Sequence, residues 1–357
     1  MADPVLPADQ IDTDASIRTE IGTLQKTLTN ESAPLALRFR ALFALKSYAS
    51  ASPPTSVTLS AIQAIAAAFD SPSALLKHEL AYCLGQTRKL ECVPYLRKVL
   101  EDRHEDAMCR HEAAEALGAL GDEGSLDLLT EIEKDEGDEV VVRETCEIAV
   151  ERIRWEHGAG RSRERLKERS VWNSVVQWID FADGRCSDFT SIDPAPPMPQ
   201  EEKQPLISDL EATLLDTKLP LFLRYRAMFA LRDLASPPDL PTAVPAIQAL
   251  ARGFRDPSAL FRHEIAFVFG QLSHPASIPS LIETLSDSRE ASMVRHEAAE
   301  ALGSLGDEEG VEDILKKFVN DPEQVVRESI IVALDMAEFE KSGEAEYVLV
   351  PEVAQAA

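Results

Sequence analysis

Apolar residues recur along the chain at helical spacing, in short segments that turn residues separate. Two such segments cover residues 57–69 and 73–84, and Asp70-Ser71-Pro72-Ser73 between them has the composition of a turn followed by a helix N-cap. No segment alternates between apolar and polar positions as a half-buried strand does. The pattern therefore predicts an all-α protein made of helix–turn–helix units.

These units repeat at two scales. Aligned on the pattern Arg-x-x-small-x-x-Ala-Leu, the second helices of the units place His78, His111 and Glu144 33 residues apart. The second half repeats the first, because His263 and His296 each follow their counterparts by 185 residues. A helix–turn–helix repeat of this length is typical of a HEAT-type solenoid, in which each repeat covers the apolar face of its neighbour. We expect two four-repeat arms related by pseudo-twofold symmetry.

The repeat pattern also sets the predicted domain boundaries. The N-terminal arm is expected at residues 16–155 and the C-terminal arm at residues 206–340. Residues 1–15 and 341–357 lack a clear amphipathic period and are predicted to be flexible ends. The remaining residues, 156–205, contain a charged stretch and two tryptophans and end in a proline-rich segment, which is typical of an extended linker.

Composition and charge restrict the function classes. The formal net charge of −26 argues against nucleic-acid binding, which needs a Lys/Arg surface, and fits either a basic protein partner or simple solubility. Five cysteines without a CxxC motif are typical of a reducing compartment. The N-terminus does not resemble a signal peptide, and no apolar run approaches the roughly 18 residues of a membrane helix. We expect a cytosolic monomer, with the nucleus as the alternative compartment and no membrane association.

Four of the seven histidines occupy equivalent positions in the repeats, and a glutamate follows each of them. The pairs are His78-Glu79, His111-Glu112, His263-Glu264 and His296-Glu297. The first and last repeats of both arms carry Phe39, Glu144, Tyr225 and Glu328 at the histidine position instead. Folding of the repeat therefore does not require the pairs, which favours a functional role for them over a merely polar helix surface.

Stacked helices can bring these pairs to one metal site. Equivalent residues on neighbouring second helices share a face, and the helix axes lie about 8–10 Å apart. Two histidines and one carboxylate with open positions are typical of oxygen-activating non-haem iron sites, so two facing arms would form a dinuclear centre. Zinc is the stronger rival metal, but the absence of cysteine ligands and the high carboxylate count favour iron or manganese. A HExxH protease motif is absent, because residues 115 and 300 are glutamates. His104, His157 and His274 lie outside the repeat position and are interpreted as surface histidines.

Four His-Glu pairs on two four-repeat arms closely resemble the deoxyhypusine hydroxylase family, over about residues 20–340. The resemblance implies a dinuclear iron monooxygenase that uses O₂ and an electron donor to hydroxylate the deoxyhypusine side chain of its translation-factor substrate. Carried over to this sequence, one iron would be held by His78, His111 and Glu112, and the other by His263, His296 and Glu297. Glu79 and Glu264 would be either further ligands or contacts to the substrate amines.

Two other functions stay open on the sequence alone. A HEAT adaptor that only binds proteins, or a chromophore-lyase-like HEAT protein, would tolerate loss of the four histidines, whereas a hydroxylase would not. Gly85-Gln86 and Gly270-Gln271 follow only the first His-Glu pair of each arm. They are therefore predicted to shape the pocket.

Overall fold

The computed structural model describes residues 8–158, 191–198 and 206–342, and every regular element in this part of the chain is a helix. In the N-terminal half the helices are α1 (Ala8–Thr29), α2 (Leu35–Ala49), α3 (Thr58–Ala66), α4 (Ala74–Gln86), α5 (Val93–Glu101), α6 (Ala107–Leu120), α7 (Leu126–Lys134) and α8 (Val140–His157). In the C-terminal half they are α10 (Ile207–Leu215), α11 (Leu221–Ala235), α12 (Ala243–Ala251), α13 (Ala259–Leu272), α14 (Ile278–Ser286), α15 (Ser292–Gly303), α16 (Val311–Leu315) and α17 (Gln324–Ser342). Short 3-10 turns are η1 (Leu90–Cys92), η2 (Glu123–Ser125), η3 (Arg252–Arg255), η4 (Pro275–Ser277) and η5 (Lys316–Phe318). The all-α prediction is confirmed.

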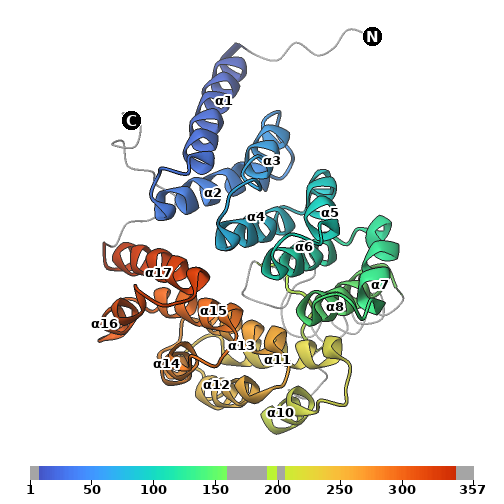
Figure 1. Cartoon of the computed structure of the whole chain (residues 1–357), viewed down its shortest axis with the longest axis vertical. Helices are drawn as coiled ribbons and strands as arrows, with labels where there is room; N and C mark the ends of the chain where they lie inside the picture. Colours follow the sequence, from blue (N-terminus) through green and yellow to red (C-terminus); the bar gives the residue numbers. More distant parts are fainter. Residues whose placement is uncertain (1–7, 159–190, 199–205, 343–357) are drawn as a thin grey trace, which may run out of the picture.

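The helices form successive pairs, each with an outer and an inner member (Figure 1). The inner helices are α2, α4, α6 and α8 in one half and α11, α13, α15 and α17 in the other. Each inner helix packs against the next one, as well as against the outer helix of its own pair. This is the packing that the HEAT-type repeat predicts, because each unit covers the apolar face of its neighbour.

A buried arginine fastens inner helices to the end of the preceding outer helix. Arg110 of α6 donates from Nε to the carbonyl of Leu100 in α5 over 3.0 Å, and its Nη2 donates to Asp138 Oδ2 over 2.7 Å. The hydrogen bond from Arg110 is the main reason why the pKa of the Asp138 carboxyl is lowered. Equivalent Nε bonds, each to a carbonyl ten residues upstream, come from Arg38, Arg224 and Arg295. Each of these arginines thus donates a hydrogen bond to a backbone carbonyl that has no partner within the outer helix. Such a bond from a cation at a helix C-terminus is favourable.

Glycines allow the inner helices to approach closely. A Cβ atom on Gly85 of α4 would lie 2.8 Å from the Cα of Ala116 in α6, and one on Gly118 of α6 would lie 2.9 Å from the Cα of Ala149 in α8. Both distances are to backbone atoms, which cannot rotate away. The Leu-Gly pair near the end of each of these two helices is therefore a packing requirement of the stack.

We expect Gly118→Val to lower the free energy of unfolding by about 1–3 kcal/mol or more, because α6 and α8 must separate to admit the side chain. Gly22→Ala is the matched control, since a Cβ on Gly22 in α1 meets no described atom within 4 Å. That change should stabilise the protein by about 0.5–1 kcal/mol, through helix propensity. Urea denaturation of both metal-free variants measures the difference, and equal midpoints would contradict the close-packing argument.

The two halves contact each other at both ends of the stack. Helix α8 packs against α11 and α13, and helix α17 packs against α2 and α4. At one junction Ser258, the N-cap of α13, donates to Glu144 Oε2 over 2.7 Å, and at the other Ser73, the N-cap of α4, donates to Glu328 Oε2 over 2.7 Å. The inner helices thus close around a common interior. The pseudo-twofold relation between the arms stays a prediction, although these paired contacts are what it would produce.

Some boundaries differ from the prediction. Helix α1 begins at Ala8, whereas residues 1–15 were expected to form a flexible end. The loop after α2 provides the physical reason: Ser56 Oγ donates to the Asp14 carboxylate, and Arg18 Nη2 donates to the Ser56 carbonyl over 3.1 Å. Trp172 and Trp178 lie outside the described residues. Among the helices described here, none combines the length and apolar character needed to cross a membrane. The division into arms, linker and tails otherwise remains a prediction.

Candidate metal centre

The four repeat histidines, far apart in sequence, meet in the interior between the two halves. They come from α4, α6, α13 and α15, which stack side by side within each half. Ring centroids are 5.3 Å apart for His78–His111 and 5.3 Å apart for His263–His296. Across the halves, His78 lies 5.9 Å from His263 and 5.4 Å from His296, and His111 lies 5.4 Å from His263. His111 and His296 are completely buried, and the other two are nearly so.

Carboxylates of the same pairs reach these rings. Glu112 Oε2 lies 3.3 Å from His78 Nε2, and Glu297 Oε2 lies 3.4 Å from His263 Nε2. In each half, the histidine of the first pair therefore meets the glutamate of the second. Glu79 lies beside its own histidine, with Oε1 3.3 Å from His78 Nδ1.

Burial and charge act on these groups in opposite ways. Burial lowers the pKa of His111 and His296, and neighbouring imidazoles lower it further. At His78 burial also disfavours the charged ring, but Glu112 and Glu79 outweigh it and raise the pKa well above 6.5. Glu264 is only 1% exposed, and its pKa is raised by burial first and then by Glu112 and other carboxylates. The site therefore concentrates acidic groups that a cation would stabilise.

Most ligand atoms of the centre have no hydrogen-bond partner. Within the described part of the chain, seven of the eight ring nitrogens of these histidines are buried and make no hydrogen bond, and the same holds for Glu264 Oε1. Carboxylate oxygens lie 3.3–3.6 Å from three of these nitrogens without hydrogen-bond geometry. A buried polar atom without a partner costs about 1–3 kcal/mol, so a fold that gathers this many requires an explanation. Nitrogen and carboxylate atoms facing one another in a buried interior are the donor set that transition metals bind. The residues present fit a metal.

Three groups of residues have ligand atoms within 4.8 Å of one another, which is close enough to hold an ion. One is His78, His111 and Glu112, the first ligand set predicted from the sequence. The second predicted set, His263, His296 and Glu297, does not appear as one group. Instead His296 groups with Glu297 and Glu300, and separately with His78 and His263. The assignment of individual ligands therefore stays a prediction.

Two glutamates in the centre were not among the predicted site residues. Glu300 Oε1 lies 3.6 Å from His296 Nδ1 and accepts a hydrogen bond from Ser329 over 3.0 Å. Burial raises the pKa of Glu115 well above its usual value, and the charges of Glu112 and Glu264 raise it further. Each follows a repeat histidine by four residues, which places it on the same helix face one turn later. That spacing is the sequence signal that could have identified them.

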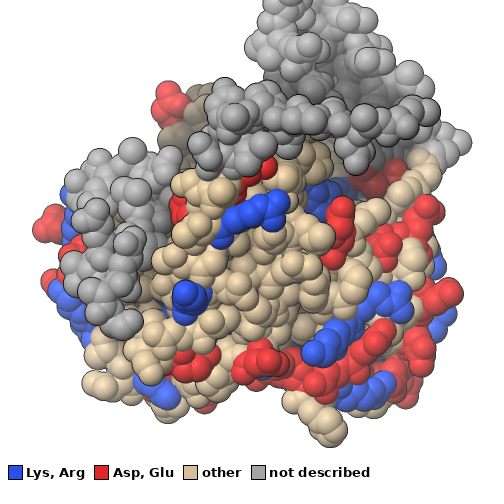
Figure 2. Space-filling view, turned by 90° about the horizontal axis from the view of Figure 1, so that it is seen from above, with Lys and Arg blue, Asp and Glu red and all other residues tan. Residues whose placement is uncertain are grey.

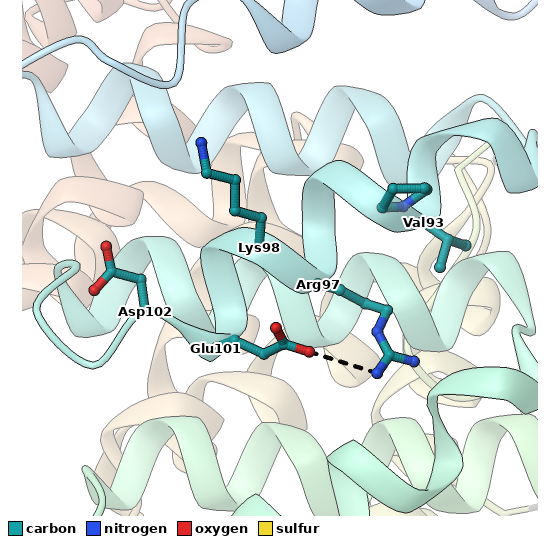
Figure 3. Close-up of a pocket in the computed structure, with 6 residues that line it drawn as sticks. Val93, Arg97, Lys98, Glu101 and Asp102 are labelled. Atoms are coloured by element: carbon teal, nitrogen blue, oxygen red, sulfur yellow. Dashed lines mark hydrogen bonds and ion pairs between the residues drawn. The ribbon is translucent and has the colours of Figure 1, made fainter.

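The remaining histidines lie away from the centre, as the sequence analysis predicted. His104 is exposed in the turn before α6, His157 ends α8 with Nε2 2.8 Å from the Gly121 carbonyl, and His274 caps η4. A surface hollow on α5, lined by residues such as Arg97 and Asp102, is also separate (Figure 3). All of its residues come from this one outer helix and the residue that follows it, so it offers no link to the metal ligands.

Comparisons with known proteins identify the family of this chain. HEAT repeats are matched at residues 62–150 and 244–335. The deoxyhypusine hydroxylase of Phaeosphaeria nodorum is 69% identical over 334 residues, covering 94% of this chain and 96% of that protein. The deoxyhypusine hydroxylase of Aspergillus oryzae is 66% identical over 349 residues, covering 98% of each. The chain belongs to the deoxyhypusine hydroxylase family.

A solved structure of a human member places the fold in the same family. The structure of human deoxyhypusine hydroxylase in complex with glycerol superposes with a TM-score of 0.74 at 40% sequence identity. It covers 92% of this chain and 99% of the human chain. Deoxyhypusine hydroxylases are metal-dependent enzymes, and the His/Glu groups of this centre could bind the metal. The predicted fold and family are confirmed.

Proposed function

We propose that this chain is a deoxyhypusine monooxygenase. It inserts one oxygen atom of O₂ into a C–H bond of the deoxyhypusine side chain on a translation factor, which completes hypusine. The second oxygen atom leaves as water, with two electrons from a separate donor and two protons. Family membership with full-length coverage supports this activity, and so does the centre of inward-facing imidazoles and carboxylates.

The observation that carries the metal assignment is the set of seven unpartnered, buried ring nitrogens. Two iron ions per chain are proposed, one held by His78, His111 and Glu112 and the other by His263, His296 and Glu297. Histidine and carboxylate ligands without cysteine favour iron over zinc. Iron bound there would supply the activation of O₂ that C–H hydroxylation needs.

The chain's own residues provide the pocket for a long cationic side chain. Glu79 and Glu264 are proposed either as further ligands or as partners for the substrate amines, and charge-assisted hydrogen bonds of this kind are strong. The buried position of Glu264 raises its pKa, and an amine beside it would offset the repulsion from neighbouring carboxylates. Because the four histidines are buried, a side chain held beside them would meet little bulk water, and this would strengthen these contacts.

The net charge of the protein indicates the kind of partner that it binds. With a net charge of −26, the protein is proposed to bind a translation factor through basic groups around the modified residue, and not nucleic acid. On the face shown in Figure 2, acidic side chains gather along one edge, with basic side chains among them, and the middle is largely uncharged. The protein is proposed to act as a monomer in the cytosol, with the nucleus as the alternative.

The test is hydroxylation by purified, iron-loaded protein. A translation factor carrying deoxyhypusine is incubated with the protein, O₂ and a chemical reductant. Mass spectrometry then measures the mass of the factor's peptide that carries the deoxyhypusine residue. We expect a gain of one oxygen atom, and about two iron ions per chain by elemental analysis. Metal-free protein is the control and should leave the mass unchanged. Iron-loaded protein that binds the factor without changing its mass would leave a HEAT adaptor as the function.

A further inference from the structure

Residues 191–198, from the part of the chain predicted to be an extended linker, pack between the two halves. On the N-terminal half, the side-chain amide of Gln86 at the end of α4 pairs with the backbone of Ile192. Ile192 N donates to Gln86 Oε1 over 2.7 Å, and Gln86 Nε2 donates to the Ile192 carbonyl over 3.3 Å. Ile192 is 7% exposed and Ala195 is completely buried, so the segment is part of the interior.

On the C-terminal half, the same segment forms a buried ion pair. Arg232 of α11 has no exposed surface and donates from Nη1 and Nη2 to the two carboxylate oxygens of Asp193, over 2.7 and 2.8 Å. Gln271 at the end of α13 accepts from Arg232 over 2.8 Å and donates to Ser191 Oγ over 2.7 Å. A planar, bidentate arginine–carboxylate pair without water is strong and directional. The segment is therefore held by both halves at once.

The segment lies beyond the metal centre along α4 and α13. His78 meets His263, and four residues later Tyr82 stacks edge-on against Phe267, with centroids 5.9 Å apart. Two such levels of contact show that α4 and α13 run in the same direction. Gln86 and Gln271 follow the two histidines by eight residues, about 12 Å along the helices. From the metal centre toward the C-termini of α4 and α13, the histidines are thus followed by the Tyr82–Phe267 contact and then by residues 191–193.

The opposite direction is lined by small side chains. The residues four positions before the four histidines lie on the same helix faces, one turn toward the N-termini. They are Ala74, Ala107, Ala259 and Ser292, all partly exposed. The residues four positions after the histidines are large: Tyr82, Glu115, Phe267 and Glu300. All eight residues are partly exposed, but the side chains one turn toward the helix N-termini are smaller than those one turn toward residues 191–198.

We propose that residues 191–198 form a brace that holds the two halves at a fixed separation and closes the metal centre on the C-terminal side of its helices. Metal and substrate then reach the centre from the N-terminal side, past Ala74, Ala107, Ala259 and Ser292. Asp193 is a positioning residue, because it acts through its ion pair with Arg232. The part of this inference that concerns substrate rests on the proposed function, whereas the brace and the route for metal do not.

The decisive variant is Asp193→Asn, compared with Asp233→Asn. Asp233 also accepts from Arg232, from Nε over 3.1 Å and from Nη2 over 3.0 Å, and both of these bonds lie within α11. In metal-free protein we expect Asp193→Asn to lower the melting temperature by several degrees, because loss of one partner of a buried pair is strongly destabilising. In metal-loaded protein, well below melting, release of metal to a chelator should accelerate roughly ten-fold or more. Asp233→Asn should also lower the melting temperature, because it removes another acceptor of the buried Arg232, but it should change metal release much less.

A second variant tests the route. Ser292→Phe places a large ring on the N-terminal side of the centre, one turn before His296. Metal uptake by the metal-free protein should therefore slow. KM for the protein substrate should also rise by a larger factor than kcat falls. Equal release rates for Asp193→Asn and Asp233→Asn would overturn the brace. Unchanged uptake in Ser292→Phe would overturn the N-terminal route. Because the melting, release and uptake measurements need no hydroxylation, they remain decisive even if the proposed function fails.

Discussion

Replacing His296 with alanine is expected to deplete the protein of iron and to reduce hydroxylation by at least about 100-fold. Even residues that only orient a metal ligand cost roughly 10–100-fold in metal affinity or activity, and His296 is proposed to be a ligand itself. It belongs to two of the three groups of residues that could hold an ion. Its loss therefore disturbs both halves of the centre. Iron content and turnover of the purified variant are the measurements.

The stability of the metal-free variant separates this effect from misfolding. His296→Ala removes a fully buried ring whose two nitrogens lack partners, which favours folding, but it leaves a cavity, which opposes folding. These contributions are of similar size, so the free energy of unfolding should change by no more than about 1 kcal/mol. His104→Ala, at an exposed turn, is the control and should keep iron and activity. A His296→Ala protein with normal iron and turnover would refute the assignment.

The repeat is the reason why so much of the fold and centre could be predicted from sequence. A solenoid presents the same structural position several times, so differences between copies separate folding from function. His78 and Glu144 occupy equivalent positions, yet one faces the metal centre and the other bonds Ser258 across the junction between the halves. Periodicity alone predicts that such residues share a face. It also predicts that stacking brings them within reach of one another.

The contacts of residues 191–198 could not be predicted in the same way. This segment has no helical period, and its prolines favour an extended chain in isolation, so it was interpreted as a linker. Its position depends instead on the pairing of Asp193 with Arg232, 39 residues later, and of Ile192 with Gln86, 106 residues earlier. Single-sequence patterns carry no information on such long-range partners. The sequence predicts that Gln86 and Gln271 shape the pocket. In the structure both of them form hydrogen bonds with residues 191–192.

Glu115→Gln is expected to raise KM for the deoxyhypusine substrate by about 10–100-fold while iron content stays normal. The carboxylate lies one helical turn beyond His111, and the pKa of Glu115 is raised by burial and by the charges of Glu112 and Glu264. A cationic amine beside Glu115 would relieve the repulsion among these carboxylates. A hydrogen bond to a charged group contributes about 1.5–3 kcal/mol, which corresponds to this change in KM. Steady-state kinetics with iron analysis is the measurement.

Glu300→Gln should behave differently, although Glu300 holds the equivalent position in the other half. Its carboxylate lies 3.6 Å from His296 Nδ1 and falls in a group that could hold an ion, whereas no such group contains Glu115 among the described residues. We therefore expect Glu300→Gln to lose iron as well as activity. Glu123→Gln, on the surface near η2, is the control and should leave both unchanged. If Glu115→Gln lost iron to the same extent as Glu300→Gln, both carboxylates would belong to the metal site. The substrate amine would then need another partner, with Glu79 and Glu264 as the remaining candidates.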